Sequence, residues 1–331
     1  MILKRFLFVL ISFLFIASSF GQKIVYSQPE REDSRRMDFE IIGKVSGNFL
    51  VYKKIRSQAY VAVYNSEMEQ IEKQEQKYLP DDRLINVDFF PYNDFAYVVY
   101  QYQKRNVVYC DAVKIDGTGK KVSDVIALDT SHIGFAASNK IYSTVTSEDK
   151  SKLMVFKINS RNKSKFVITT LLFDNNLALS KRSTFVMPME EREDYLDEFN
   201  VDNDGDFVFA KFNRNNNETI NSTNLIWKKA DSDSIASIEV PYKDILLDEL
   251  HIKVDNPNKR YFLTSFYYKQ KRGNIEGFYF YVWDKQTQLP ALQNSVVLGD
   301  ELRKEARGDA NMKMAFNDYF IKNVIVKKDG G

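Results

Sequence analysis

The clearest structural signal in this chain lies in residues 84–119, which read LINVDFFPYNDFAYVVYQYQKRNVVYCDAVKIDGTG. Runs rich in β-branched and aromatic residues alternate here with turn-forming residues, and the runs span 84–90, 95–102 and 107–115. Asp116-Gly117 favours a hairpin, because it readily adopts the positive φ angles that tight turns require. We predict three antiparallel strands in this stretch and a fourth, outer strand at 122–127.

The way these strands end recurs at a near-constant interval. Apolar runs stop at an Asn or Asp five times, at Asn65, Asp116, Asp174, Asp231 and Asp284. The intervals are 51, 58, 57 and 53 residues. That length is typical of a four-stranded module, and stacked modules of this kind usually form a β-propeller. We therefore predict an all-β propeller of four-stranded antiparallel blades, with one or two β-sandwiches as the alternative.

The predicted count is five repeats plus the first strand of a sixth, at 318–327. Residues 328–331 then resemble the first-to-second-strand turn of that sixth repeat, so the sequence stops inside a repeat. Two explanations stay open, namely a fragment of a longer protein or a last strand that pairs with something already placed. Residues 299–309 form the one clearly helical pattern, and 69–76 fits either a strand or a short helix.

The first 21 residues have the order of a Sec signal peptide. Two basic residues precede an apolar run of eleven residues (6–16), and Ser19 and Gly21 supply the small residues before a cleavage site. A membrane anchor is the alternative, but spanning needs about 20 apolar residues. No Cys follows the run to accept a lipid. We predict a periplasmic or secreted domain at 22–331, with no transmembrane segment after cleavage.

The charge balance argues against a nucleic-acid partner. The chain has 47 Lys and Arg against 45 Asp and Glu. Lys4 and Arg5 leave with the signal peptide, so the mature chain is about neutral. Phosphate binding needs a basic field, and neither the composition nor a long Lys/Arg run provides one. The single cysteine, Cys110, rules out an intramolecular disulfide, so stability must come from a packed core.

Residues for metal or nucleophilic chemistry are scarce. The imidazole and thiol groups are those of His132, His251 and Cys110, whereas a zinc site takes three or four such ligands. No Gly-x-Ser-x-Gly motif is present. Residues 202–206 carry Asp at alternate positions, as calcium loops do, but the EF-hand pattern fails because Asn213 stands at its twelfth position. We predict no metal and no cofactor, and interpret 202–206 as a turn.

Carboxylates offer the one candidate site. Asp197 and Glu198 lie in a predicted first strand, and Asp248 and Glu249 repeat them one repeat later. If first strands surround a central channel, the four side chains approach one rim. They could then bind a cation or act as an acid/base pair on a sugar. The alternative is a solvated loop whose charges keep the surface soluble.

Trp283-Asp284 stands where WD40 repeats carry Trp-Asp, but the other repeats lack that dipeptide and its preceding Gly-His. The chain resembles instead uncharacterised exported β-propeller-like proteins of Bacteroidetes-type bacteria, in the stretches 95–106, 267–277 and 316–331. The resemblance covers most of the mature chain. It implies relatives that continue past 331, and it implies no activity and no functional residues.

These observations favour an exported, non-catalytic binding or scaffold module of the cell envelope, with a protein or glycan ligand. The alternative function is a hydrolase or lyase that acts on a glycan through Asp197, Glu198, Asp248 and Glu249. Fold class alone decides neither.

Overall fold

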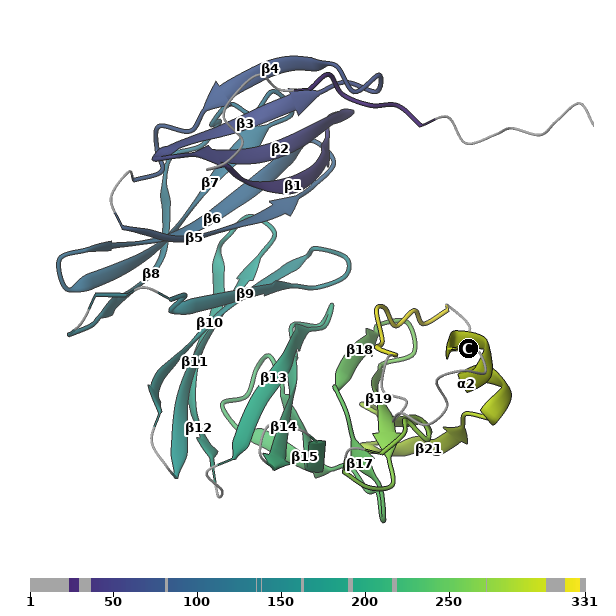
Figure 1. The fold of residues 1–331 in the computed structure, drawn as a ribbon. Coiled ribbons are helices and arrows are strands. Elements are labelled where there is room, and N and C mark those ends of the chain that lie inside the picture. The colour runs from purple at the N-terminus through teal and green to yellow at the C-terminus, as the bar shows by residue number, and fades with distance from the viewer. Residues whose placement is uncertain are drawn as a thin grey trace, which may run out of the picture. The chain divides into compact units, whose positions relative to one another are not determined.

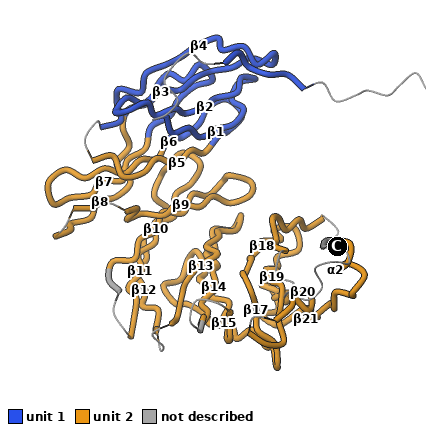
Figure 2. The backbone as a smooth tube through the Cα atoms, in the orientation of Figure 1, with its two compact units in different colours: residues 1–81, 91–98, 113–124 blue, residues 82–90, 99–112, 125–331 orange. Residues whose placement is uncertain are grey.

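The computed structural model describes residues 24–29, 37–80, 83–134, 136–137, 139–161, 164–189, 193–215, 219–271, 273–307 and 319–327. The predicted signal peptide (1–21) lies outside these residues. No helix among the described residues has the length and apolar character needed to cross a bilayer. The chain divides into two compact units, coloured separately in Figure 2. Unit 1 comprises Met1–Asp81, Pro91–Val98 and Val113–Asp124, and unit 2 comprises the rest.

Three four-stranded antiparallel sheets follow one another along the chain, each with its strands in sequence order (Figure 1). The first contains β1 (Met37–Val45), β2 (Asn48–Ile55), β3 (Gln58–Tyr64) and β4 (Gln70–Glu75). The second contains β5 (Leu84–Pro91), β6 (Phe95–Lys104), β7 (Val107–Asp116) and β8 (Ile126–His132). The third contains β9 (Tyr142–Thr146), β10 (Lys152–Arg161), β11 (Lys165–Asp174) and β12 (Leu179–Pro188).

A nine-stranded sheet joins two further meanders. The first of them contains β13 (Asp194–Val201), β14 (Phe207–Asn215), β15 (Thr219–Lys228) and β16 (Ile235–Glu239). The second contains β18 (His251–Asp255), β19 (Arg260–Tyr268), β20 (Gly277–Asp284) and β21 (Leu289–Val297). The two-residue strand β17 (Leu246–Leu247) pairs with both β15 and β19 and so connects them. The prediction of an all-β chain of four-stranded antiparallel sheets is confirmed.

Two predicted strands begin elsewhere. The outer strand of the second sheet starts at Ile126 rather than 122. Lys121 forms an isolated bridge with Ile115, and Val122 N–H donates to Lys114 O at 2.8 Å. The ladder then breaks, because the Ser123 hydroxyl rather than a backbone carbonyl accepts the Lys114 N–H. The first strand of the fifth repeat is interrupted, since residues 248–250 lie between β17 and β18.

The C-terminal predictions have mixed outcomes. The predicted helix is present as α2 (Asp300–Arg307), and the ambiguous stretch 69–76 forms the strand β4. The predicted strand at 318–327 is wrong for 319–327, which pairs with no strand of the described chain. Its Tyr319 ring instead packs against Phe266, at 6.3 Å between centroids. The predicted turn at 328–331 lies outside the described residues.

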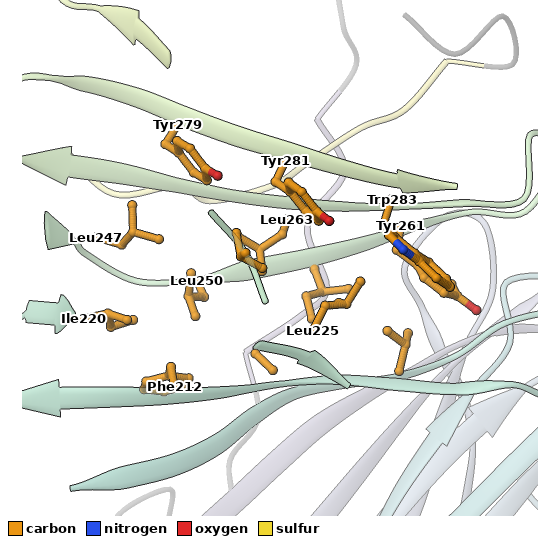
Figure 3. Close-up of a cluster of buried hydrophobic side chains, with 14 of the residues drawn as sticks. Phe212, Ile220, Leu225, Leu247, Leu250, Tyr261, Leu263, Tyr279, Tyr281 and Trp283 are labelled. Carbon is orange, nitrogen blue, oxygen red and sulfur yellow. The ribbon is translucent and has the colours of Figure 1, made fainter. Parts of the chain in front are cut away.

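Buried side chains in unit 2 fill the space between successive meanders, which pack face to face. Alternation along β20 directs Tyr279, Tyr281 and Trp283 to one side, toward Leu225 and other residues of the preceding meander (Figure 3). The rings of Trp283 and Trp227, from different meanders, meet edge to face at 4.9 Å. A second cluster fills the space between the third sheet and β13–β15 in the same manner. Burial on both faces explains the high aromatic content without a ligand.

Removing one ring from that second cluster tests this packing. Phe209 is fully buried, with its ring centroid 5.1 Å from Phe199 and 5.2 Å from Phe207. We expect Phe209→Ala to lower the free energy of unfolding by about 3–5 kcal/mol, because a cavity remains among the rings. Urea unfolding followed by circular dichroism measures the change. The exposed Phe320 provides the matched control, and Phe320→Ala should change stability by less than about 0.5 kcal/mol.

Candidate functional site

The turns between first and second strands of three successive repeats are hydrogen-bonded to one another. Asp149 N–H donates to Asn203 Oδ1 (3.2 Å), and Asn203 N–H donates to Asn256 Oδ1 (2.8 Å). The Asn256 amide then donates to Glu148 Oε2 (2.9 Å), which closes the cycle. We call Glu148, Asp149, Asn203 and Asn256 the turn rim. All four lie in unit 2.

Polar side chains stabilise these turns by accepting hydrogen bonds from the backbone of their own turn. The turn-rim residues can therefore form hydrogen bonds with the neighbouring turn. Asp202 Oδ1 accepts the N–H groups of Asp204 and Asp206 in the second turn, and Asp255 Oδ1 accepts Asn258 N–H in the third. The second turn also needs Gly205, whose φ of +91° is unfavourable for other residues. Short polar residues of this kind stabilise turns because they bond their own backbone.

An open pocket of ≈ 420 Å³ adjoins the turn rim. Its lining adds the partly buried Lys253 and, from the C-terminal segment, Val326 and Lys327. The pocket therefore presents carboxylate and amide oxygens together with two ammonium groups and little aromatic surface. Such a set can recognise a polar ligand through several hydrogen bonds. It contains no nucleophile with an adjacent base, which covalent catalysis would require.

A buried lysine holds the three aspartates of the second turn. Lys285 Nζ lies 2.6 Å from Asp202, 2.7 Å from Asp204 and 2.9 Å from Asp206. Burial opposes the charge on Lys285, but the hydrogen bonds that it donates to the three carboxylates raise its pKa above the usual value. Hydrogen bonds from Lys259 and Lys285 lower the pKa of Asp204. An ammonium group thus sits where a calcium ion would have to bind, in agreement with the interpretation of 202–206 as a turn.

The four predicted carboxylates lie away from the turn rim. Asp197 and Glu198 stand in the middle of β13 at its bulge, and Asp248 and Glu249 precede β18. Glu198 lies near enough to Asp197 and Glu249 to interact electrostatically with both, and Asp248 interacts in the same way with Glu249. The structure therefore places the four in one region, which we call the acidic group. Burial raises the pKa of Glu198 and of Asp248, and the neighbouring carboxylates add to both shifts.

Glu198 is fixed in place by the next repeat. It adopts a φ of +58° at the β-bulge of β13, a conformation uncommon for a residue with a side chain. Its Oε2 accepts the N–H of Ile252 at 2.8 Å, and its Oε1 lies 3.8 Å from His251 Nδ1. A buried Nε2 of His251 has no hydrogen-bond partner among the described residues.

Sequence reasoning missed two partners of Asp248 and the whole turn rim. Tyr268 donates a hydrogen bond to the Asp248 carboxylate, and the charge of Arg214 opposes the rise in its pKa. The pKa of Tyr268 rises to about 12 through burial and the nearby carboxylates. No sequence motif connects these residues. The turn rim did have a signal, since short polar or acidic residues fill the first-to-second-strand turns of all three repeats.

Lys285→Met removes the ammonium from Asp202 and Asp206 and leaves Asp204 paired with Lys259. We expect this substitution to lower the free energy of unfolding by about 3–5 kcal/mol at neutral pH, because it leaves buried charge unpaired. In the unsubstituted protein the lowered pKa of Asp204 stabilises the folded state. This contribution is fully present at a pH above the pKa of Asp204 in the unfolded chain, and it is lost as the pH falls through the pKa of Asp204 in the folded chain. The variant should therefore lose less stability on acidification.

Urea unfolding from pH 7 to pH 3 measures both effects. Lys243 is exposed, so Lys243→Met serves as the matched control with unchanged stability. Equal stability of the two variants at neutral pH would contradict the role given to Lys285.

No family model and no curated protein matches this chain. Among solved structures, it is similar to a prolyl endopeptidase, with a TM-score of 0.44 and 12% identity over 80% of this chain and 37% of that one. It is also similar to prolyl oligopeptidase B from Galerina marginata, with a TM-score of 0.33 and 10% identity over 79% of this chain and 44% of that one.

A third similar structure is a Synechocystis apocarotenoid oxygenase variant, with a TM-score of 0.37 and 9% identity over 79% of this chain and 61% of that one. This chain thus spans between 37% and 61% of the length of these three proteins. At such identities and TM-scores, the similarities carry no argument about the activity of this chain.

Proposed function

We propose that this protein is an exported, non-catalytic binding module of the cell envelope, built as a β-propeller of which the sheets described above are blades. The near-constant repeat and the face-to-face packing in unit 2 support the propeller. The signal-like sequence at 1–21 and the resemblance to exported proteins of Bacteroidetes-type bacteria support the location.

The observation that carries the binding function is the turn rim. Side chains from three successive repeats form one closed hydrogen-bonded cycle beside a pocket of ≈ 420 Å³. Turns that hold one another in this way give a rigid polar surface, and a preorganised surface binds with a smaller loss of conformational entropy. Carboxylates, amides and the Lys253 ammonium suit a ligand rich in hydroxyl or amide groups. We therefore propose a glycan or an extended polar peptide of the envelope as the ligand.

Asn256 contributes two bonds to the turn rim, so Asn256→Ala tests its role. Isothermal titration of the purified protein with soluble peptidoglycan fragments and with a panel of soluble polysaccharides measures affinity. We expect binding by the unsubstituted protein and about tenfold weaker binding by Asn256→Ala, since losing about 1.4 kcal/mol has that effect. Asn176 lies in an exposed third-to-fourth-strand turn, and Asn176→Ala is the matched control. Equal affinity of both variants would contradict a role for the turn rim.

The second candidate function is a glycan hydrolase or lyase that uses the acidic group. The raised pKa values of Glu198 and Asp248 favour it, because a general acid must hold its proton near the working pH. His251 beside Glu198 adds a second titratable side chain. One observation argues against this function, because Ile252 N–H donates a hydrogen bond to one carboxylate oxygen of Glu198.

Glycan turnover separates the two functions. The same polysaccharide panel, analysed for new reducing ends or unsaturated products, should show no turnover by the unsubstituted protein if it is a binding module. If turnover occurs and disappears in both Asp248→Ala and Glu249→Ala with the fold retained, the binding-module proposal is wrong and the acidic group is catalytic.

A further inference from the structure

The last strand of the nine-stranded sheet, β21, has an unusual edge. All nine residues of Leu289–Val297 are exposed, and the described strands leave one long side of β21 unpaired. The sequence LPALQNSVV contains no charged residue. The outer strands β4, β8, β12 and β16 each carry at least one charge, which is how natural proteins discourage pairing at sheet edges. β21 lacks that protection over most of its length, and Pro290 interrupts only its beginning.

The backbone of β21 offers hydrogen-bonding groups on this open side. Leu298 N–H donates to Glu276 O at 2.9 Å, so position 298 faces β20. Hydrogen-bonded pairs alternate in an antiparallel ladder, and Leu292, Asn294 and Val296 therefore face β20 as well. The N–H and C=O groups of Gln293, Ser295 and Val297 point the other way. Ser295 agrees with this assignment, because its N–H donates to its neighbour's side chain, Asn294 Oδ1 (2.8 Å), rather than to β20.

The side chains of β21 are complementary to a reversed copy of themselves. When two copies of the strand run antiparallel with Asn294 opposite its own counterpart, Leu292 faces Val296 of the second copy, and Gln293 faces Ser295. The next pair is Ala291 with Val297. Apolar residues thus meet apolar residues and polar residues meet polar ones, and no like charges oppose each other. Leu292 and Val296 are 53% and 50% exposed in the single chain, so the pairing would cover apolar surface.

The same register also satisfies the backbone. The pair 293/295 brings together residues whose groups point outward, as hydrogen-bonded pairs must. Ala291 lies at the β-bulge of β21, where the alternation is interrupted, so the backbone argument holds for residues 292–297. Asn294 then forms a non-hydrogen-bonded pair with its counterpart, in which Cα atoms approach to about 4.5 Å. Side-chain complementarity and backbone parity are separate requirements, and one register meets both.

We propose that two copies of this protein associate through β21, antiparallel and centred on Asn294, so that the sheet continues across a two-fold axis. A second copy fits better than a foreign strand, because an isologous contact needs a patch that is complementary to itself, and β21 is. The Asn294 side chain, which accepts Ser295 N–H in the single chain, releases that group to the partner strand on pairing.

Substituting Asn294 by a positively or a negatively charged residue tests the proposal in the purified protein. Sedimentation velocity over a concentration series should show a monomer–dimer equilibrium. Asn294→Lys and Asn294→Glu should each raise the dissociation constant by about fivefold, because like charges then face each other across the axis. An equimolar mixture of the two variants should restore dimerisation, since opposite charges then meet. Asn294→Ala, which removes the same side chain without adding charge, should dimerise like the unsubstituted protein.

Cross-linking tests the register. Asn294→Cys should form an intermolecular disulfide under mild oxidation, because Cα atoms about 4.5 Å apart lie within disulfide range. Val297→Cys, three residues from the axis, should not. The native Cys110 is fully buried and does not interfere. If the protein is monomeric at every concentration, the proposal is wrong, and the β21 edge would be open to a strand of another protein. If a disulfide forms at position 297 but not at 294, the proposed register is wrong.

Discussion

One ammonium group links the polar and apolar parts of unit 2. Lys285, from the turn after β20, forms ion pairs with Asp202, Asp204 and Asp206 on the first-to-second-strand turn of the preceding repeat. Asp206 in turn accepts the indole N–H of Trp227, and Asp202 accepts the Tyr261 hydroxyl. Those two aromatic residues belong to the core between the meanders. The same turn supplies Asn203 to the turn rim, so the position of the proposed binding surface depends on the Lys285 contacts.

The packing of repeats explains why the proposed sites lie where they do. In unit 2 the central strands are buried between successive meanders, which leaves strand ends and outer strands such as β21 as accessible surfaces. The turn rim occupies one end of the first strands, whereas the acidic group lies at the β13 bulge and in the segment before β18. The edge of β21 is accessible for a different reason, because the described chain supplies no further strand to pair with it. These three surfaces differ in chemistry, being polar, acidic and charge-free respectively.

Sequence patterns predicted strands well where alternation and turn residues agreed. The runs at 84–90, 95–102 and 107–115 correspond to β5, β6 and β7. Prediction failed where a side chain replaced a backbone group in the ladder, as the Ser123 hydroxyl does before the second sheet's outer strand. It also failed at 319–327, because an alternating pattern is compatible with a strand but does not supply a partner for its hydrogen bonds. For the acidic group, repeat spacing indicated that Glu198 and Glu249 would approach, whereas nothing in the sequence connected Asp248 to Tyr268.

The sequence by itself determined the all-β class, the four-stranded repeat and the turn character of 202–206, because strand periodicity and turn chemistry are local properties. Tertiary structure alone decided which charges meet. Lys285 lies 79 or more positions from the three aspartates that it holds, and Asn256 reaches a glutamate 108 residues away. Long-range ionic and hydrogen-bonding partners are selected by how sheets stack, and no local pattern encodes that geometry. The paired charges, the turn rim and the backbone parity of β21 therefore became visible only in the folded chain.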